Sequence, residues 1–225
     1  MEMRVAIHVD ERLHTVLEDY IVTIYRLQEA YGSAKTTYIA RELNVAPATV
    51  TKVLANLSSK GFIRKQRYKG AVLTEAGLKL ARKIVWKHRV LEVFLHKILE
   101  FDVFDVHDLA HSMEHIPDEI VERMYVKLSM PKACPHGNPI SSEGGDEDLE
   151  RLTSCSPGEA CEIRRIVGEF KWVLNFLKRS EITLGSLVSV EAKDKENVYI
   201  RKGDELIPVP RDIAYVIAVK RVMLE

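Results

Sequence analysis

The chain has 225 residues, 46% of them hydrophobic, and its 33 basic side chains are balanced by 33 acidic ones. This composition is enough for the buried cores of one large or several small domains, and it excludes wholesale disorder. The N-terminal segment lacks the apolar run of a signal peptide, and no segment approaches the ~18 apolar residues of a membrane span, so we expect a cytoplasmic protein without a membrane partner.

The first third of the chain has the element order of a winged helix-turn-helix. Apolar side chains recur at helical spacing over residues 11–31, and residues 36–43 and 46–60 predict two short helices joined by a tight turn. Residues 62–66 and 71–74 predict the two strands of a hairpin around the turn RYKG. Helices and hairpin in this order are typical of a DNA-binding module.

The second of the two short helices predicts a DNA-reading surface. Its buried side is apolar, whereas its N-terminal end carries small or polar side chains that leave room for the major groove. From Lys35 to Glu75 there are eight basic and two acidic residues, a charge that suits phosphate contacts. The alternative is a generic helical core with a solvated basic hairpin. The predicted DNA contacts are Pro47, Ala48, Thr49, Thr51 and Lys52 in the helix, and Arg67 and Lys69 at the hairpin tip.

The rest of the chain predicts helices followed by strands. Residues 75–99, 104–115 and 117–129 predict three helices, and residues 131–150 break the periodicity with proline, glycine, serine and acidic residues. Short β-rich runs beyond the break suggest a small barrel of about 70 residues. We therefore expect an α+β multidomain protein with a winged helix-turn-helix domain at 1–75, a helical domain at 76–140, a linker at 141–151 and a barrel domain at 152–225.

The helix predicted over 104–115 aligns three imidazoles and a carboxylate. His107, His111 and His115 follow one another at intervals of four, and Glu114 joins their stripe because a helix advances about 100° per residue. His107 and His115 are nevertheless about 12 Å apart along the axis, too far for one ion with bonds of about 2.1–2.3 Å. Two centres fit better. One is His111, Glu114 and His115, with a position open to another carboxylate; the other is His107, with His88 and Glu92 of the preceding helix.

These stretches resemble the diphtheria toxin repressor family of metal-activated transcriptional repressors, which includes iron- and manganese-dependent regulators. The resemblance runs nearly end to end and rests on LEDYIVTIYRL, the winged helix, KHRVLEVFL, VHDLAHSMEH and GNPI. It implies a homodimer that binds a palindromic operator, a C-terminal SH3-like barrel, and Mn(II) or Fe(II) as cofactor with two ions per subunit. It assigns a primary site to Asp19, His111, Glu114 and His115, and an ancillary site to His88, Glu92 and His107.

The chain departs from the family pattern at several ligand positions. His111 stands where iron-type members have cysteine and manganese-type members have glutamate, and Val22 replaces a second carboxylate of the manganese type. Because the primary set has no thiolate, Mn(II) or Fe(II) is favoured over zinc or copper. The resemblance leaves open whether the barrel contributes a ligand near Glu169, and whether Cys134 and His136 bind the second ion.

The sequence leaves three functions to be weighed. In the favoured one, an ion joins Asp19 to the helices behind the DNA-reading module and fixes a dimer for its operator; activation fades below about pH 6 because the imidazoles must be deprotonated. A metal-dependent enzyme and a metal-independent winged-helix regulator are the alternatives, but no H-E-x-x-H motif or nucleophile-base pair indicates an enzyme. Val90, Val93, Phe94 and Ile98 form either a dimer seam or core, and Cys155 and Cys161 are expected to serve packing.

Overall fold

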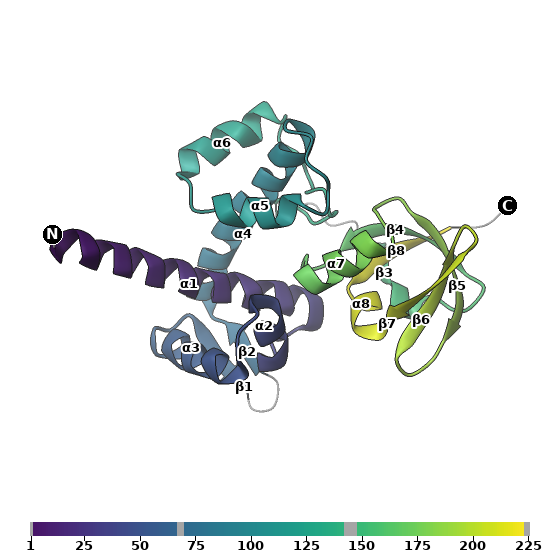
Figure 1. The fold of residues 1–225 in the computed structure, drawn as a ribbon, viewed down its shortest axis with the longest axis horizontal. Helices are drawn as coiled ribbons and strands as arrows, with labels where there is room; N and C mark the ends of the chain where they lie inside the picture. The colour runs from purple at the N-terminus through teal and green to yellow at the C-terminus, as the bar shows by residue number, and fades with distance from the viewer. Residues whose placement is uncertain (1, 67–69, 142–147, 223–225) are drawn as a thin grey trace. The chain divides into compact units, whose positions relative to one another are not determined.

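The computed structural model describes residues 2–66, 70–141 and 148–222, with residues 2–14 described by their backbone alone (Figure 1). The chain divides into two compact units. Unit 1 comprises Met1–His88 and Ser112–Val121, and unit 2 comprises Arg89–His111 and Glu122–Glu225. Three helices cross a boundary between the units, namely α4 (Glu75–Lys97), α5 (Val106–Met113) and α6 (Asp118–Lys127).

Unit 1 contains the winged helix-turn-helix. Its elements are α1 (Glu2–Tyr31), α2 (Thr36–Leu43), α3 (Pro47–Ser59), β1 (Ile63–Gln66) and β2 (Gly70–Leu73). Helix α1 begins nine residues earlier than predicted, and it contacts α2, α3 and β2. The side chains of Ile21, Ile24 and Leu27 are fully buried, so the C-terminal half of α1 supports the DNA-reading module.

The turn between α2 and α3 follows from its residues. Asn44 adopts a left-handed φ of 51°, and the amide of Val45 donates to the carbonyl of Ala40 at 3.0 Å, which closes the end of α2. Pro47 then starts α3, where a missing N–H costs nothing because the first turn has no intrahelical partner for it. The tight helix-turn-helix geometry is thus encoded locally.

The base of the hairpin requires Gly70. This residue has a φ of 97°, and a Cβ built on it would lie 2.0 Å from the carbonyl oxygen of Ala34. Ala34 and Ala71 exchange two backbone hydrogen bonds of 2.9 Å, so the segment before α2 pairs with the wing. A larger residue at position 70 would separate the wing from this segment.

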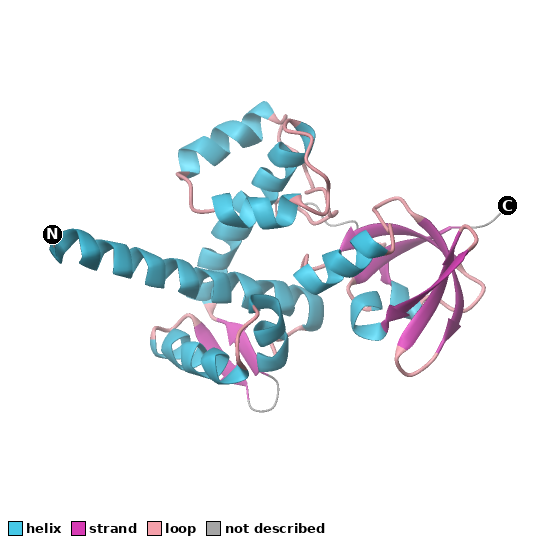
Figure 2. Cartoon of the chain, viewed as in Figure 1, coloured by secondary structure: helices cyan, strands magenta, loops and turns pink. Residues whose placement is uncertain are grey.

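The barrel domain lies within unit 2. Its strands, which are magenta in Figure 2, are β3 (Glu150–Arg151), β4 (Ala160–Ile166), β5 (Leu187–Lys193), β6 (Asn197–Lys202), β7 (Glu205–Pro210) and β8 (Ile217–Val222). They form one sheet of antiparallel pairs in the order β3-β8-β4-β5-β6-β7. The short helix η1 (Leu152–Ser154) and helices α7 (Lys171–Arg179) and α8 (Arg211–Ala214) complete it. Val188, Val190, Val198 and Ile200 are buried at alternate positions, as expected for strands with one face on a core.

The predicted α+β multidomain class is confirmed, and the helix predicted over 104–115 is present but shorter at both ends. Helix α5 ends at Met113, so Glu114 and His115 lie in the following turn and do not continue the stripe of His107 and His111. Pro117 explains the early end, because the residue before a proline is disfavoured in helical conformation. The domain boundaries at 75, 140 and 151 stay predictions.

Two further expectations concern apolar side chains. Val90 and Val93 are buried within the single chain, so they belong to its core, whereas Ile98 is exposed. Within the described residues, no helix is both long enough and apolar enough to cross a bilayer.

Candidate metal centres and nucleic-acid interface

The first candidate metal centre lies in unit 1, at the C-terminal half of α1. Ligand atoms of Asp19, Glu114 and His115 all lie within 4.8 Å of one another. Asp19 comes from α1, while Glu114 and His115 come from the turn after α5. Atoms bound to one ion at about 2.1 Å are separated by no more than about twice that distance, so a small adjustment would let this group share a cation. This group is called centre A.

Centre A is partly open to solvent. Glu114 is buried, with Oε2 lying 2.9 Å from Nδ1 of His88, whereas the side chain of His115 is 36% exposed. Nδ1 of His115 lies 3.2 Å from Oε2 of Glu18, a residue that sequence reasoning missed. The adjacent acidic pair 18-ED-19 was the signal that could have indicated it. Two carboxylates and one imidazole therefore meet at a solvent-accessible position, with a third carboxylate beside them.

The structure does not bring His111 into this group. His111 is half-buried in α5, and it is not among the clustered ligand atoms in the described part of the chain. The predicted primary site thus keeps three of its four members together. His111 as a ligand stays a prediction of the family resemblance.

The second candidate centre lies in unit 2, and its residues are buried. Ligand atoms of Glu92, Cys134, His136 and Glu169 lie within 4.8 Å of one another, and all four residues are buried. Nδ1 of His136 lies 3.3 Å from Oε1 of Glu92, and Nδ1 of His107 lies 3.1 Å from the same oxygen. Cys134 donates its S–H to Oε1 of Glu169 at 2.9 Å. These five residues, with His107 included, are called centre B.

Centre B holds protons in the absence of a cation. Burial raises the pKa of the Cys134 thiol well above its usual value, and the carboxylates of Glu169 and Glu92 raise it further. Burial alone would lower the pKa of His136, but the carboxylates of Glu92 and Glu169 more than offset this, so its pKa is raised. A cation entering this site must displace these protons, which couples binding to pH.

Asn138 connects centre B to the barrel. Its Nδ2 donates to the carbonyl of Ile166 at 2.7 Å and to Oε1 of Glu169 at 2.8 Å. Its Oδ1 accepts from Nε of Arg165 at 2.7 Å, and its backbone carbonyl accepts from the amide of Cys134 at 2.9 Å. The side chain is fully buried, so one amide fixes both the Cys134 loop and the carboxylate opposite it.

Close backbone packing holds the same loop in place. Gly137 has a φ of 79°, and a Cβ there would lie 2.3 Å from the carbonyl oxygen of Arg164. The amide of Ile166 donates to the carbonyl of His136 at 2.9 Å. Glu169 itself has a positive φ of 50°, a conformation that costs a non-glycine residue free energy and is often found at functional sites. These contacts hold the loop that carries Cys134 and His136 against the end of β4, beside centre B.

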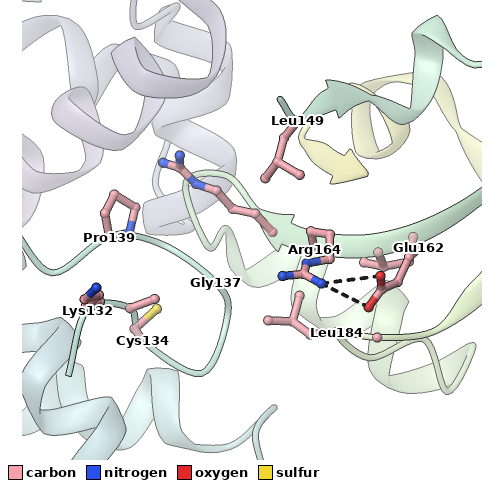
Figure 3. Close-up of a pocket in the computed structure, with 12 residues that line it drawn as sticks. Lys132, Cys134, Gly137, Pro139, Leu149, Glu162, Arg164 and Leu184 are labelled. Carbon is pink, nitrogen blue, oxygen red and sulfur yellow. Dashed lines mark hydrogen bonds and ion pairs between the residues drawn. The ribbon is translucent and has the colours of Figure 1, made fainter. Parts of the chain in front are cut away.

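A pocket of about 700 Å³ borders the Cys134 loop (Figure 3). Cys134, Gly137 and Pro139 line one part of it, and β4 lines another. Arg164 and Glu162 form an ion pair of 3.3 Å among the lining residues. The pocket places open space next to the residues that carry Cys134.

His88, the remaining predicted ancillary ligand, belongs to unit 1. It is the last residue of the first segment of unit 1, it is fully buried, and its imidazole lies against Glu114. Glu92 follows one helical turn later in α4. His88, Glu92 and His107 as ancillary ligands stay predictions of the resemblance; Glu92 and His107 lie together in centre B.

Helix α3 has the two faces that sequence analysis predicted. Val50, Leu54 and Leu57 are buried, and Val53 is half-buried. The predicted DNA contacts of this helix are all exposed: Pro47, Ala48, Thr49, Thr51 and Lys52. The hydroxyl of Thr51 donates to the carbonyl of Pro47 at 3.0 Å, so it stays with its own helix in this conformation.

A groove of about 690 Å³ runs beside this helix in unit 1. It is lined by Thr51 and Leu54 of α3, by the start of α2 and by the wing. Lys35 and Lys65, which were not among the predicted contacts, supply exposed cations to it. Arg67 and Lys69, the predicted wing contacts, lie outside the described residues. A basic groove next to a small-residue helix face suits a duplex backbone.

The geometry defines a DNA-reading module joined to a metal-binding helical region and a small barrel, and comparisons with known proteins place this class in a family. Residues 12–71 match the iron-dependent repressor N-terminal DNA-binding domain, residues 74–142 match the iron-dependent repressor metal-binding and dimerisation domain, and residues 150–221 match the FeoA domain. The chain is 30% identical over 222 residues to the iron-dependent repressor IdeR of Mycobacterium tuberculosis, covering 91% of this chain and 96% of that one.

Solved structures of similar proteins point to the same family. The crystal structure of T. acidophilum IdeR matches with a TM-score of 0.76 at 30% identity, covering 91% of this chain and 97% of that chain. The structure of the manganese regulator SloR matches with a TM-score of 0.78 at 26% identity, covering 92% and 98%. The chain therefore belongs to the iron-dependent repressor family of metal-dependent transcriptional regulators, as the resemblance implied.

Proposed function

We propose that this repressor uses a divalent cation as co-repressor, with centre A as the switch. One observation carries the proposal: Asp19, on the helix that supports the DNA-reading module, meets Glu114 and His115 within 4.8 Å. Glu18, Asp19 and Glu114 place three carboxylates near one another, and their repulsion opposes this arrangement unless positive charge is present. Bound Mn(II) or Fe(II) would supply that charge.

The residues of centre A act on DNA binding through α1. A cation bound by Asp19, Glu114 and His115 would hold the turn 114–115 against α1, and α1 in turn contacts α2, α3 and β2. When Asp19, Glu114 and His115 are drawn together, the helix behind the recognition helix is fixed in one position. Cation and DNA then favour each other's binding by a reciprocal factor, about 5- to 150-fold in typical cases.

We assign the second ion of each subunit to centre B. Its ligands are Glu92, Cys134, His136 and Glu169, with His107 within reach of the same Glu92 oxygen. Two carboxylates, imidazoles and one thiol form a mixed donor set that admits Fe(II) and Zn(II) as well as Mn(II). Centre A, which has only oxygen and nitrogen donors, is better suited to Mn(II) or Fe(II). The two centres together account for two ions per subunit.

The DNA contacts follow from the exposed face of unit 1. The exposed residues Thr49 and Lys52 would contact bases, as would Thr51 once its hydroxyl leaves the carbonyl of Pro47. Lys35 and Lys65, which line the groove, would contact phosphates. The site read is a palindromic operator, because the protein acts as a homodimer and a two-fold axis relates its recognition helices. Exposed apolar side chains in unit 2 suit the dimer contact: Ile98, Leu99, Phe101, Val126 and Met130.

The test begins with duplexes selected from a random pool in the presence of Mn(II), followed by fluorescence anisotropy with and without the ion. Wild-type protein is expected to bind the selected duplex at least about 5-fold more tightly with Mn(II) or Fe(II). Asp19→Ala and His115→Ala should lose this difference, while Glu119→Ala, which removes an exposed carboxylate from the same segment, should keep it. Metal-free protein that binds as tightly as the loaded protein would refute the co-repressor role.

A further inference from the structure

Cys155 and Cys161 lie outside both metal centres, in the barrel. Cys155 follows η1, and Cys161 is the second residue of β4. Neither side chain is accessible to solvent, and the two Sγ atoms are 3.0 Å apart. Both are free thiols. They serve packing, as expected, but their sulfurs also face each other at contact distance.

The backbone holds the two cysteines in this position from both ends. The amide of Cys155 donates to the carbonyl of Leu152 at 3.3 Å, which fixes it to η1. Cys161 is paired in register with Val188 on one side and Arg221 on the other. The connecting turn is tied to β5, because the amide of Gly158 donates to the carbonyl of Val190 at 2.7 Å. The sulfur pair is therefore a fixed feature of the barrel.

We propose that Cys155 and Cys161 form an oxidant-reactive dithiol that closes to an intrachain disulfide with hydrogen peroxide. The sulfurs need to approach by only about 1 Å, since a disulfide bond is about 2.05 Å long and they are now 3.0 Å apart. The intervening segment has five residues, so the second thiol is held at a high effective concentration. Peroxides are the chemical class of oxidant that this site takes.

Cys155, which adjoins the exposed residue Ser156, is the attacking sulfur. The hydrogen bond from Cys161 lowers the pKa of Cys155, and the guanidinium of Arg221 contributes in the same direction. The Cys155 thiolate attacks one peroxide oxygen, the O–O bond breaks, and the leaving hydroxide takes up a proton to give water and a sulfenic acid at Cys155. Cys161 then attacks the Cys155 sulfur, the S–O bond breaks, and hydroxide leaves with the Cys161 proton as a second water. Two thiols lose two electrons, and one peroxide gains them.

The segment that joins the two cysteines contains an exposed turn. Ser156, Pro157 and Gly158 are exposed, and Gly158 has a φ of 89° with no atom within 4 Å of a Cβ position. Transient release of the two backbone hydrogen bonds that join Gly158 and Glu159 to Val190 would open this turn without unfolding the barrel and admit a molecule as small as hydrogen peroxide. Cys134 differs in its partner, because its thiol donates to the carboxylate of Glu169 and not to a second thiol.

The experiment uses the full-length chain, fully reduced and then freed of reductant. The protein is treated with hydrogen peroxide, quenched, denatured, alkylated and analysed by intact and peptide mass spectrometry. We expect alkylatable thiols to fall from three to one, with the loss of two hydrogen atoms in the peptide that contains Cys155 and Cys161. Dithiothreitol should restore all three. Protein already bridged on isolation would show one thiol before reduction and three after it, which equally supports the pair.

Variants separate this pair from the third thiol. Cys134→Ser should still lose two thiols to peroxide, whereas Cys155→Ser and Cys161→Ser should form no intrachain bridge. Because the wild type and Cys134→Ser give the answer alone, the test does not depend on the folding of the two barrel variants. Three alkylatable thiols after peroxide treatment, or a bridge that includes Cys134, would overturn the proposal. The measurement involves neither DNA nor metal, so its outcome is independent of the proposed function.

Discussion

Centres A and B use similar side chains in opposite environments. In centre A the imidazole of His115 is 36% exposed and Asp19 is half-buried, and the carboxylates lie near a third one, Glu18. In centre B every ligand is buried: Cys134 donates its S–H to Glu169, and Nδ1 of His136 lies 3.3 Å from a carboxylate oxygen of Glu92. Centre B is therefore preorganised and closed, whereas centre A is open to exchange with ions in solution. An exchangeable centre suits a sensor, and a closed one suits a structural role.

The largest expected contrast is in stability. Glu92→Ala should lower the free energy of unfolding of the metal-free protein by about 3–5 kcal/mol, because it leaves two buried imidazoles, His107 and His136, without their carboxylate. Asp19→Ala removes a half-buried carboxylate next to others and should cost less than about 1 kcal/mol. Chemical denaturation of the two variants measures both. Equal losses would mean that the two centres do not differ in preorganisation.

A smaller effect is expected from Asn138→Ala. The substitution leaves Glu169 and the carbonyl of Ile166 without its amide, which should cost about 1–3 kcal/mol. Metal affinity at centre B should fall by roughly 10- to 100-fold, as for other groups that orient a ligand. Co(II) absorption reports this directly, because only centre B has a thiol among the described donors. Unchanged Co(II)–thiolate absorption and affinity would remove Asn138 from the positioning of centre B.

Replacing the sulfur should change which metal centre B prefers. Cys134→Ser exchanges a soft donor for a hard one, so Zn(II) affinity should fall by at least about tenfold while Mn(II) affinity changes less. Centre A, which has no sulfur, serves as the internal control. Competition titrations with a chelator of known affinity give both values. A parallel loss for the two metals would show that Cys134 does not ligate.

The smallest effect concerns pH. The pKa of His136 is raised in the folded, metal-free protein, so its contribution to stability is fully present below about pH 6.5, the unfolded value. This contribution is lost as pH rises through the raised pKa. Thermal unfolding of metal-free wild type and His136→Gln should therefore converge toward alkaline pH and diverge toward pH 6. A difference that grows with pH would contradict the assignment.

The part of this molecule that sequence predicts is the part set by local spacing. The two faces of α3 and the pairing of Glu92 with His107 follow from helical periodicity and from residue type. The end of α5 at Met113 required attention to Pro117, whose effect on the preceding residues outweighs the regular His-Glu spacing.

Contacts set by tertiary structure could not be predicted in the same way. Glu169 follows β4 and contributes to centre B with a positive φ, and Asn138 joins its own loop to Arg165, Ile166 and Glu169, which are 27, 28 and 31 residues further along the chain. Glu18 meets His115 only because the turn after α5 lies against α1. Helix or strand periodicity in the sequence does not predict these contacts, because they depend on how separate elements pack.

Mn(II) binding measured by electron paramagnetic resonance, with and without the selected operator duplex, tests the central claim most directly. Because coupling between two ligands is reciprocal, the duplex should tighten Mn(II) binding by the same factor by which Mn(II) tightens DNA binding. His115→Ala should abolish this tightening, and Glu119→Ala should preserve it. If the operator leaves every Mn(II) affinity of the wild type unchanged, centre A is not the switch that controls this repressor.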